Sequence, residues 1–190
     1  KKDKSVSVIF DKVTFYSQLT TAIKYFSRTK TGALIVIERE TKLGEHIKTG
    51  TFINAQLSSQ LLKNVFFNKA PLHDGAVILR NYRLYSAGCF LPLSTNESID
   101  ENMGTRHRAA IGITEVSDAV AVVVSEETGK ISIVCDGELI QGLNQKSLRK
   151  ELSKLLIPST NNPTINNPHV TIKTYISYDF NPHISNSGII

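Results

Sequence analysis

The sequence of 190 residues contains two cysteines and no long apolar run, and both facts exclude classes of protein. Cys89 and Cys135 are too few for a disulfide framework, and because both lie in apolar stretches we expect buried, reduced thiols. Apolar runs such as AVAVVV at 119–124 are far shorter than the ~18 residues of a membrane-spanning helix. A secretory signal is missing as well. A disulfide-rich secreted protein and a membrane-embedded one are therefore both disfavoured.

Several common catalytic motifs are also missing. The sequence has no Walker loop, no G-x-G-x-x-G, no G-x-S-x-G elbow and no Cys/His cluster with zinc spacing. Basic residues do not interleave with aromatic ones as they do on nucleic-acid-binding surfaces. The net charge of +5 is compatible with nucleotides, nucleic acid or lipid headgroups and does not choose among them.

The length and the apolar content fit one soluble domain with its own core. Apolar residues make up 41% of the chain, which is ordinary for a globular protein once glycine is added. Their spacing predicts helices at 13–28, at 104–115 and around 148–156, and a further helix that Ser58 or Ser59 would cap. Shorter runs predict strands at 32–38, 75–80, 84–91, 118–127, 130–135 and 137–143. This order indicates an α/β domain with a mixed central β-sheet flanked by α-helices.

The two ends of the chain differ in composition from its centre. Residues 158–168 form an Asn/Pro linker, and residues 169–180 alternate as in a half-buried strand. The N-terminus reads KKDKSVSV without methionine, which suggests a trimmed fragment from which an upstream anchor can be absent. The expected organisation is a lead-in at 1–12, one domain at 13–156, and a linker and tail at 157–190.

The segment GTRHR at 104–108 concentrates positive charge at an expected helix start. The N–H groups of a first helical turn favour an anion, and arginine binds two phosphate oxygens at once. Thr105 is a candidate helix cap. The alternative is a solvated charged loop, but the apolar AAIGI at 109–113 ties the cluster to a buried element.

The segment LHDGA at 72–76 places an acid and a histidine before a predicted strand. Asp74 can orient or deprotonate a hydroxyl group or bind a metal, and His73 can supply a nitrogen ligand. Gly75 would let a ligand approach the backbone closely. The alternative is a simple turn into the strand, since Asp-Gly is a common turn dipeptide.

Two further segments lie at the ends of predicted strands. SEE at 125–127 places carboxylates near the expected phosphate site, where Mg²⁺ or Mn²⁺ would find oxygen ligands. The alternative there is an ordinary hairpin turn. CFLPLS at 89–94 places Phe90 and Leu91 before a proline, where a base can stack on the ring. The alternative is a phenylalanine of the core.

Five segments together closely resemble the diadenylate cyclase domain. In chain order they are GALIVIER, LHDGAVI, CFLPLS, GTRHRAAIGITE and VVVSEETG. The two signature motifs of that family stand here as Asp74-Gly75-Ala76 and Arg106-His107-Arg108. The resemblance covers residues 13–156 and is closest to the membrane-anchored members, whose transmembrane segments precede the catalytic domain.

The resemblance implies an enzyme that condenses two ATP molecules into cyclic di-AMP and releases two pyrophosphates. Each 3′-hydroxyl attacks the α-phosphate of the other nucleotide, so two domains that each hold one ATP must face each other as a homodimer. A divalent cation, Mn²⁺ or Mg²⁺, is implied too. The full-length protein would lie at the cytoplasmic face of the cell membrane, whereas this fragment would be soluble.

The resemblance also implies roles for individual residues. The catalytic group would comprise Asp74, Gly75, Ala76, Arg106, His107 and Arg108. ATP would be bound by Gly75, Phe90, Leu91, Gly104, Thr105, Arg106, His107, Arg108 and Ser125. The cation would contact His73 and Glu126. Within these sets Asp74 would orient the attacking hydroxyl, Gly75 would admit the sugar, and Phe90 would stack on adenine where the family often has tyrosine.

Two other functions stay open at this point. A catalytically silent regulatory domain that binds adenine nucleotides would keep the pocket without the chemistry. Intact Asp74 and both motif arginines favour the enzyme, since a degenerate copy would be expected to lose one of them. A basic nucleic-acid-binding domain would show a steep salt dependence of DNA affinity and no ATP turnover, and we expect no nucleic-acid partner.

Overall fold

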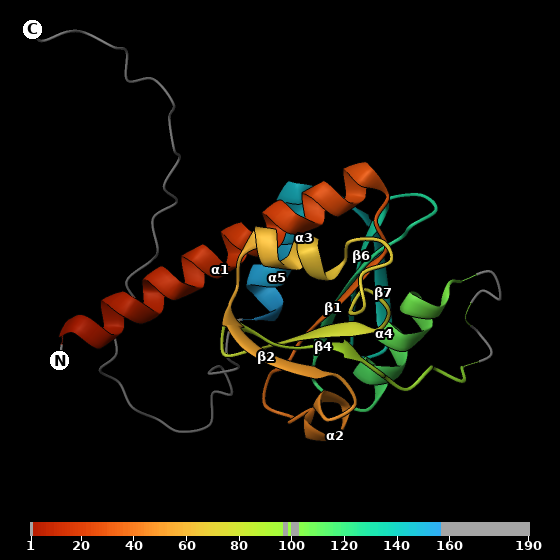
Figure 1. Cartoon of the computed structure of the whole chain (residues 1–190), viewed down its shortest axis with the longest axis horizontal. Coiled ribbons are helices and arrows are strands. Elements are labelled where there is room, and N and C mark those ends of the chain that lie inside the picture. Colours follow the sequence, from red (N-terminus) through yellow and green to blue (C-terminus); the bar gives the residue numbers. More distant parts are fainter. Residues whose placement is uncertain (1, 97–98, 100–102, 157–190) are drawn as a thin grey trace, which may run out of the picture. The chain divides into compact units, whose positions relative to one another are not determined.

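A seven-stranded sheet forms the centre of the fold, with helices against both of its faces (Figure 1). The computed structural model describes residues 2–96, 99 and 103–156, with side chains from residue 12 onward. The helices are α1 (Lys2–Thr29), α2 (Gly44–Ile47), α3 (Ser59–Val65), α4 (Thr105–Glu115) and α5 (Gln145–Leu155). The strands are β1 (Ala33–Ile37), β2 (Thr51–Gln56), β3 (Ala76–Arg80), β4 (Arg83–Cys89), β5 (Val120–Val124), β6 (Ile131–Cys135) and β7 (Glu138–Leu143). The linker and strand predicted at 158–180 lie outside the described residues.

The strands lie in the order β2-β4-β3-β1-β5-β6-β7. β1 pairs with β3 in parallel, and the other described pairs are antiparallel. β1 and β5 are buried along their whole length, which explains their continuous apolar runs, whereas the edge strands β2 and β7 are largely exposed. The predicted α/β fold with a mixed central sheet is confirmed.

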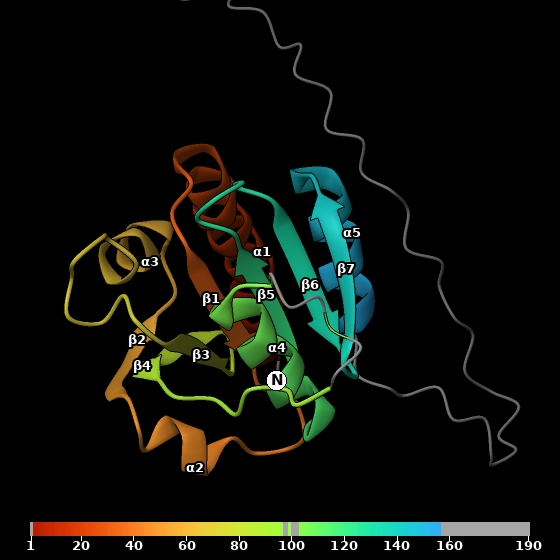
Figure 2. The same ribbon diagram turned by 90° about the vertical axis from the view of Figure 1, so that its right-hand side faces the viewer.

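Alternate side chains of the central strands fill two separate cores. Ile35 and Val77 point to the face covered by α1, α3 and α5. Leu34 and Ile78 point to the face covered by α4. Figure 2 shows α4 in front of the sheet and α1 behind it. The sheet is therefore buried on both faces, as expected for an α/β domain.

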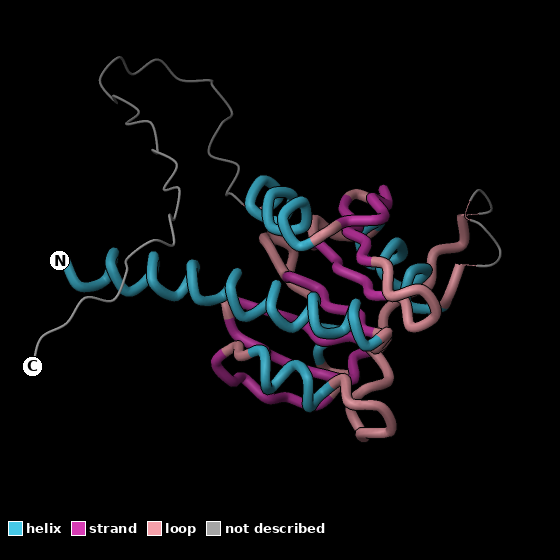
Figure 3. Tube along the Cα trace, turned by 90° about the horizontal axis from the view of Figure 1, so that it is seen from above, coloured by secondary structure: helices cyan, strands magenta, loops and turns pink. Residues whose placement is uncertain are grey.

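Helix α1 buries the face that its apolar spacing predicts. The buried residues are Phe15, Tyr16, Leu19, Ala22, Ile23 and Phe26. The helix begins at Lys2 rather than near residue 13, and its first turns run past the sheet (Figures 1 and 3). Among the described helices, α1 included, none combines the length and the apolar content that crossing a membrane requires. The anchor expected upstream stays a prediction.

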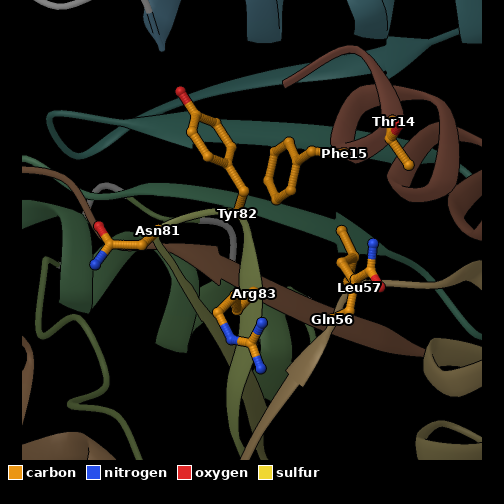
Figure 4. A pocket seen from close by; sticks show the side chains of 7 residues that line it. All are labelled: Thr14, Phe15, Gln56, Leu57, Asn81, Tyr82 and Arg83. Atoms are coloured by element: carbon orange, nitrogen blue, oxygen red, sulfur yellow. The ribbon is translucent and has the colours of Figure 1, made fainter. Parts of the chain in front are cut away.

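The contact of α1 with the β3–β4 turn leaves a small hollow beside it (Figure 4). The Phe15 and Tyr82 rings pack edge to face with their centroids 5.3 Å apart. Asn81 and Tyr82 both have positive φ, as a two-residue type I′ hairpin turn requires. The hollow of about 150 Å³ is lined by Thr14, Phe15, Gln56, Leu57, Asn81, Tyr82 and Arg83. It is too small for a nucleotide, for which pockets of several hundred Å³ are usual.

Three local expectations differ from the structure. Thr105 was expected to cap α4, but the cap is Gly104, which has no side chain to hydrogen-bond the helix, and Thr105 is the first helical residue. Cys135 is half-buried rather than buried because β6 ends there at an exposed turn, whereas Cys89 is buried as predicted. α2 and β2 were not predicted. By contrast Ser58 does cap α3, since its Oγ accepts from the Leu61 N–H at 3.1 Å.

A buried ion pair closes the carboxyl ends of β1 and β3. The Glu38 side chain is 1% exposed, and Arg80 donates to its two oxygens at 2.7 and 2.6 Å. The Leu43 N–H donates to Glu38 Oε2 at 3.0 Å. Burial alone would raise the pKa of Glu38, but these hydrogen bonds and the charges of Arg80 and Lys42 together lower it. Glu38 is thus charged throughout the neutral range.

Glu38→Gln is expected to lower the free energy of unfolding by about 2 kcal/mol at neutral pH, since it removes charge-assisted hydrogen bonds between a buried carboxylate and the half-buried Arg80. In the wild type the contribution of Glu38 is complete above the unfolded-state pKa of ~4.3 and is lost as the pH falls through the lower folded-state pKa. The variant should therefore lose less stability on acidification. Urea unfolding between pH 3 and pH 7 measures this. Glu138→Gln, at the exposed start of β7, is the control. If the stability of Glu38→Gln depended on pH as that of the wild type does, the stabilising role of the Glu38 charge would be contradicted.

Candidate functional site

An open pocket of about 650 Å³ lies at the edge of the sheet where β1 and β3 begin and β4 and β5 end. The residues that line it are Leu34, His73, Asp74, Gly75, Ala76, Cys89, Phe90, Leu91, Leu93, Thr105, Arg106, Ala109 and Glu126. A second hollow of about 160 Å³ shares Thr105, Arg106 and Glu126 with it and adds Gly104, Val124, Ser125 and Glu127. The two hollows are therefore neighbouring parts of one site.

Asp74 presents its carboxylate to the pocket just before β3. The side chain is exposed, and within the described residues it makes no hydrogen bond or ion pair. The next residue, Gly75, has a φ of +104°, and a Cβ there would lie 2.8 Å from the Gly88 carbonyl carbon of β4. Gly75 therefore permits the close approach of β4 as well as any approach of a ligand. The turn holds a free acceptor at a fixed place.

His73 offers one ring nitrogen to the pocket. Its Nδ1 lies 2.6 Å from the carbonyl oxygen of Ala70. Because a carbonyl oxygen can only accept, Nδ1 carries the proton in this contact, and in the neutral ring Nε2 then has the free electron pair. A histidine held in this way is suited to bind a metal ion through Nε2.

The N-terminus of α4 is open to an anion. Its cap, Gly104, makes no side-chain hydrogen bond, and the first turn contains no acidic residue. Arg106 donates from Nη1 to Glu126 Oε2 at 2.8 Å, but its Nε is buried and has no hydrogen-bond partner in the described part of the chain. A buried donor without an acceptor is unfavourable, and an incoming anion would satisfy it.

Glu126 and Ser125 lie in the tight turn between β5 and β6. The Ser125 N–H donates to the Lys130 carbonyl at 3.0 Å, and its Oγ accepts from the Thr128 N–H at 3.2 Å. The Glu126 side chain is 63% exposed, so its carboxylate can exchange Arg106 for another cation at little energetic cost. The turn thus presents one hydroxyl and one carboxylate beside the start of α4.

The apolar side of the pocket consists of exposed side chains on a fixed backbone. Phe90 is 69% exposed and Leu93 is 51% exposed. The Phe90 N–H donates to Thr49 Oγ1 at 2.8 Å, and the Ser94 N–H donates to the Arg108 carbonyl of α4 at 3.0 Å. An exposed ring on a rigid segment is a suitable surface for a planar apolar group.

A family model described as "DisA bacterial checkpoint controller nucleotide-binding" (DAC) matches residues 20–139, which is more than half of the chain. The chain belongs to the diadenylate cyclase (DAC) family. Cyclic di-AMP synthase CdaA of Bacillus subtilis (strain 168) is 47% identical over 134 residues, which are 70% of this chain and 49% of that protein. A diadenylate cyclase of Mycoplasma genitalium is 43% identical over 140 residues, or 73% of this chain and 69% of that protein. The chain spans about half the length of Bacillus subtilis CdaA and of a diadenylate cyclase of Listeria monocytogenes that is 46% identical over 137 residues, or 72% of this chain.

Solved structures of similar proteins agree with the fold. DacA from Staphylococcus aureus has a TM-score of 0.74 at 42% identity, over 76% of this chain and 96% of that one. A Bacillus cereus structure described as a hypothetical membrane-spanning protein has a TM-score of 0.65 at 48% identity, over 67% of this chain and 63% of that one. The predicted diadenylate cyclase fold is therefore confirmed.

The pocket gathers most, but not all, of the residues that the DAC motifs nominate. The two hollows bring together His73, Asp74, Gly75, Ala76, Phe90, Leu91, Gly104, Thr105, Arg106, Ser125 and Glu126.

His107 and Arg108 line neither hollow. His107 Nε2 lies 3.5 Å from the Oγ of buried Ser132, and burial lowers the pKa of the ring, which is neutral at pH 7. The functional roles of all these residues stay predictions.

Four residues that line the larger hollow were not predicted, namely Leu34, Cys89, Leu93 and Ala109, and neither was Val124 in the smaller one. Leu93 belongs to the CFLPLS segment of the DAC pattern, so a signal for it was present beside Phe90. Leu34 and Ala109 are core residues of β1 and α4 that reach the pocket with one side. A sequence pattern cannot distinguish them from their neighbours in the core.

The donor set fits a cation that a bound phosphate helps to hold. Within the described residues no three His, Cys, Asp or Glu side chains gather as a metal site would require. His73 Nε2 and the Glu126 carboxylate are single donors on the same pocket. Mg²⁺ and similar ions are commonly bound by one or two protein groups, with substrate phosphates and water as the remaining ligands. The fit therefore depends on a phosphate-bearing ligand.

Arg106→Ala is expected to weaken tripolyphosphate binding by roughly tenfold or more, because a charge-assisted hydrogen bond contributes about 1.5–3 kcal/mol. Isothermal titration calorimetry measures the affinity. Arg149 is an exposed residue of α5, the helix that packs on the other face of the sheet. Arg149→Ala removes the same charge and should bind as the wild type does. Equal weakening by both variants would show that net charge alone attracts the anion.

Proposed function

We propose that the protein is a diadenylate cyclase that joins two ATP molecules into cyclic di-AMP and releases two pyrophosphates. One observation carries this proposal: the Asp74 carboxylate, which has no partner among the described residues, the α4 N-terminus with Arg106, and exposed Phe90 line the same pocket. A nucleotide needs an apolar surface for its base and cationic donors for its phosphates, and this pocket offers both. Curated relatives named for the activity support the proposal.

Each domain would bind one ATP along the two neighbouring hollows. Adenine lies against Phe90 and Leu91, and the triphosphate extends to Arg106 and Ser125 at the second hollow. The volume of about 650 Å³ is within the range of pockets that bind ligands of this size. The buried Nε of Arg106 would gain an acceptor, and the open N–H groups of α4 would face the phosphates.

Asp74 would act on the attacking 3′-hydroxyl. The hydroxyl oxygen forms a bond to the α-phosphorus of the other ATP, the bond from that phosphorus to the bridging oxygen breaks, and pyrophosphate leaves with the electron pair. Asp74 accepts the hydroxyl hydrogen bond and takes the proton as the new ester forms. Phosphoryl transfer of this kind depends mainly on positioning and on neutralising charge, which is what a carboxylate at the hydroxyl and an arginine at the phosphates supply.

A divalent cation would be held by His73 Nε2 and the Glu126 carboxylate together with phosphate oxygens. When bound, such an ion neutralises part of the charge that develops on the phosphates. Glu126 now pairs with Arg106, so binding of cation and triphosphate would exchange these partners: Arg106 turns to phosphate and Glu126 to the cation.

Two domains would have to face each other for product to form. Cyclic di-AMP contains two nucleotides, and each nucleotide must supply one hydroxyl and one α-phosphate. Of the three hollows described above, only the pair at the start of α4 combines an exposed carboxylate, an open helix N-terminus and an exposed aromatic ring. Asp74 and Phe90 are both exposed at its mouth, where a second copy could approach.

Incubation with ATP and Mn²⁺ is expected to yield cyclic di-AMP, and Asp74→Asn is expected to lower the rate at least about 100-fold while largely keeping ATP affinity. Chromatography of the products and calorimetry of ATP binding measure the two effects. Asp136→Asn, in the exposed β6–β7 turn, is the matched control and should keep the wild-type rate. ATP binding without product in the wild type would favour a silent nucleotide-binding domain instead. Parallel loss of binding and rate in Asp74→Asn would contradict the role of Asp74.

The rate is expected to rise more than linearly with protein concentration where the domains are mostly monomeric, because the active species is a pair. Initial rates at fixed ATP over a hundredfold range of protein concentration measure the order. At the same total protein concentration, a mixture of wild type and Asp74→Asn should give less product per wild-type domain than wild type alone, because fewer pairs then contain two wild-type domains. A strictly linear rate in dilute protein would contradict the transient pair.

A further inference from the structure

Gly32, the residue before β1, lies directly against the ion pair at the mouth of the site. A Cβ built on Gly32 would be 2.7 Å from Arg106 Nη1, 2.7 Å from Glu126 Oε2 and 2.9 Å from Arg106 Cζ. Real side-chain carbons do not approach other atoms so closely, since interiors are already packed at contact distance. Gly32 is not among the glycines with positive φ, so its backbone conformation does not itself require glycine. The requirement comes from Arg106 and Glu126.

The backbones of both partners are attached to packed elements of the fold. Arg106 is in the first turn of α4, which packs on β1, β5 and β6. The turn that carries Glu126 is attached to α1, because Ser27 Oγ donates to the Gly129 carbonyl at 2.7 Å. Gly129 has a φ of +72°, and a Cβ there would collide with the Ser27 carbonyl oxygen. A group added at residue 32 would therefore displace the two side chains and leave their backbones in place.

We propose that Gly32 is a positioning residue: its missing side chain leaves the space that holds the Arg106 guanidinium and the Glu126 carboxylate beside the pocket, from where one turns to phosphate and the other to the cation. It touches no reacting atom and acts through these two groups. The inference rests on the proposed function, because that function assigns Arg106 to the triphosphate and Glu126 to the cation. The GALIVIER segment thereby gains a role that its strand pattern does not indicate.

Gly32→Ala separates this role from a structural one. The atoms that the methyl group would meet are the ends of flexible side chains, so the fold should tolerate it, with a melting temperature within about 3 °C of the wild type. Displacement of the pair should lower kcat/KM roughly 10- to 100-fold. The loss should fall mainly on KM for ATP and on the Mn²⁺ concentration that gives half the maximal rate, rather than on kcat.

Gly44→Ala is the matched control. Gly44 begins α2, and a Cβ there would meet no atom within 4 Å. This variant adds the same methyl group and should keep wild-type KM, kcat and cation dependence. A fall in melting temperature of Gly32→Ala with KM unchanged would assign Gly32 a structural role and overturn the proposal.

A binding cycle tests the coupling without turnover. The affinity for α,β-methylene-ATP with Mn²⁺ is measured by calorimetry for wild type, Gly32→Ala, Glu126→Ala and the double variant. Gly32→Ala alone should weaken binding about tenfold relative to the wild type. Added to Glu126→Ala, the same substitution should change the affinity by less than about threefold, because Arg106 then has room to move. Additive losses, or unchanged binding by Gly32→Ala, would overturn the proposal.

The same measurements distinguish failure of the proposed function. If the wild type binds the analogue but forms no cyclic di-AMP from ATP, the cyclase proposal fails, and the binding cycle still decides the role of Gly32. If the wild type forms product and Gly32→Ala behaves as the wild type, the Gly32 inference alone fails. If the wild type does not bind the analogue, both fail.

Discussion

Because β1 runs parallel to β3 and antiparallel to β5, the residues that precede β1 and β3 meet those that follow β5 at one edge of the sheet. β4 is antiparallel to β3 and brings Phe90 to the same edge. Gly32, Asp74, Phe90 and Glu126 thus come together from four separate parts of the chain. Open parallel sheets usually bind ligands at the carboxyl ends of their strands, but here the buried pair of Glu38 and Arg80 occupies that end of β1 and β3.

The candidate site carries several groups that lower stability when nothing is bound. The N-terminus of α4 lacks a side-chain cap, Arg106 Nε lacks a partner within the described residues, and Phe90 is exposed to water. Each is unfavourable by itself, because caps, satisfied donors and buried rings all stabilise folded proteins. The two cores on either side of the sheet offset them. The rigid parts of the fold therefore support a site whose own groups are incompletely satisfied.

The sequence predicted the elements whose burial is regular and missed those whose burial is not. The face of α1 and the runs of β1 and β5 are buried as their spacing indicates. β2 was not predicted because it is an exposed edge strand without a continuous apolar run. Its register is also irregular, and Asn54 within it has positive φ. Asp74 and Arg106 could be nominated from local chemistry. The need for glycine at residue 32 could not, because Arg106 and Glu126 lie far away along the chain.

The site also crosses the junction between two groups of strands that are completed at different times during synthesis. β3 and β4 form a hairpin, and β2 cannot pair before β4 exists, since β4 is its partner in the sheet. β5, β6 and β7 form a later meander that joins the rest of the sheet through β1 alone. Asp74 and Phe90 belong to the first group, and Glu126 belongs to the second. A nascent chain that ends before β5 would contain Asp74, Phe90 and Arg106 but not Glu126, so the site is complete only after β5 has paired with β1.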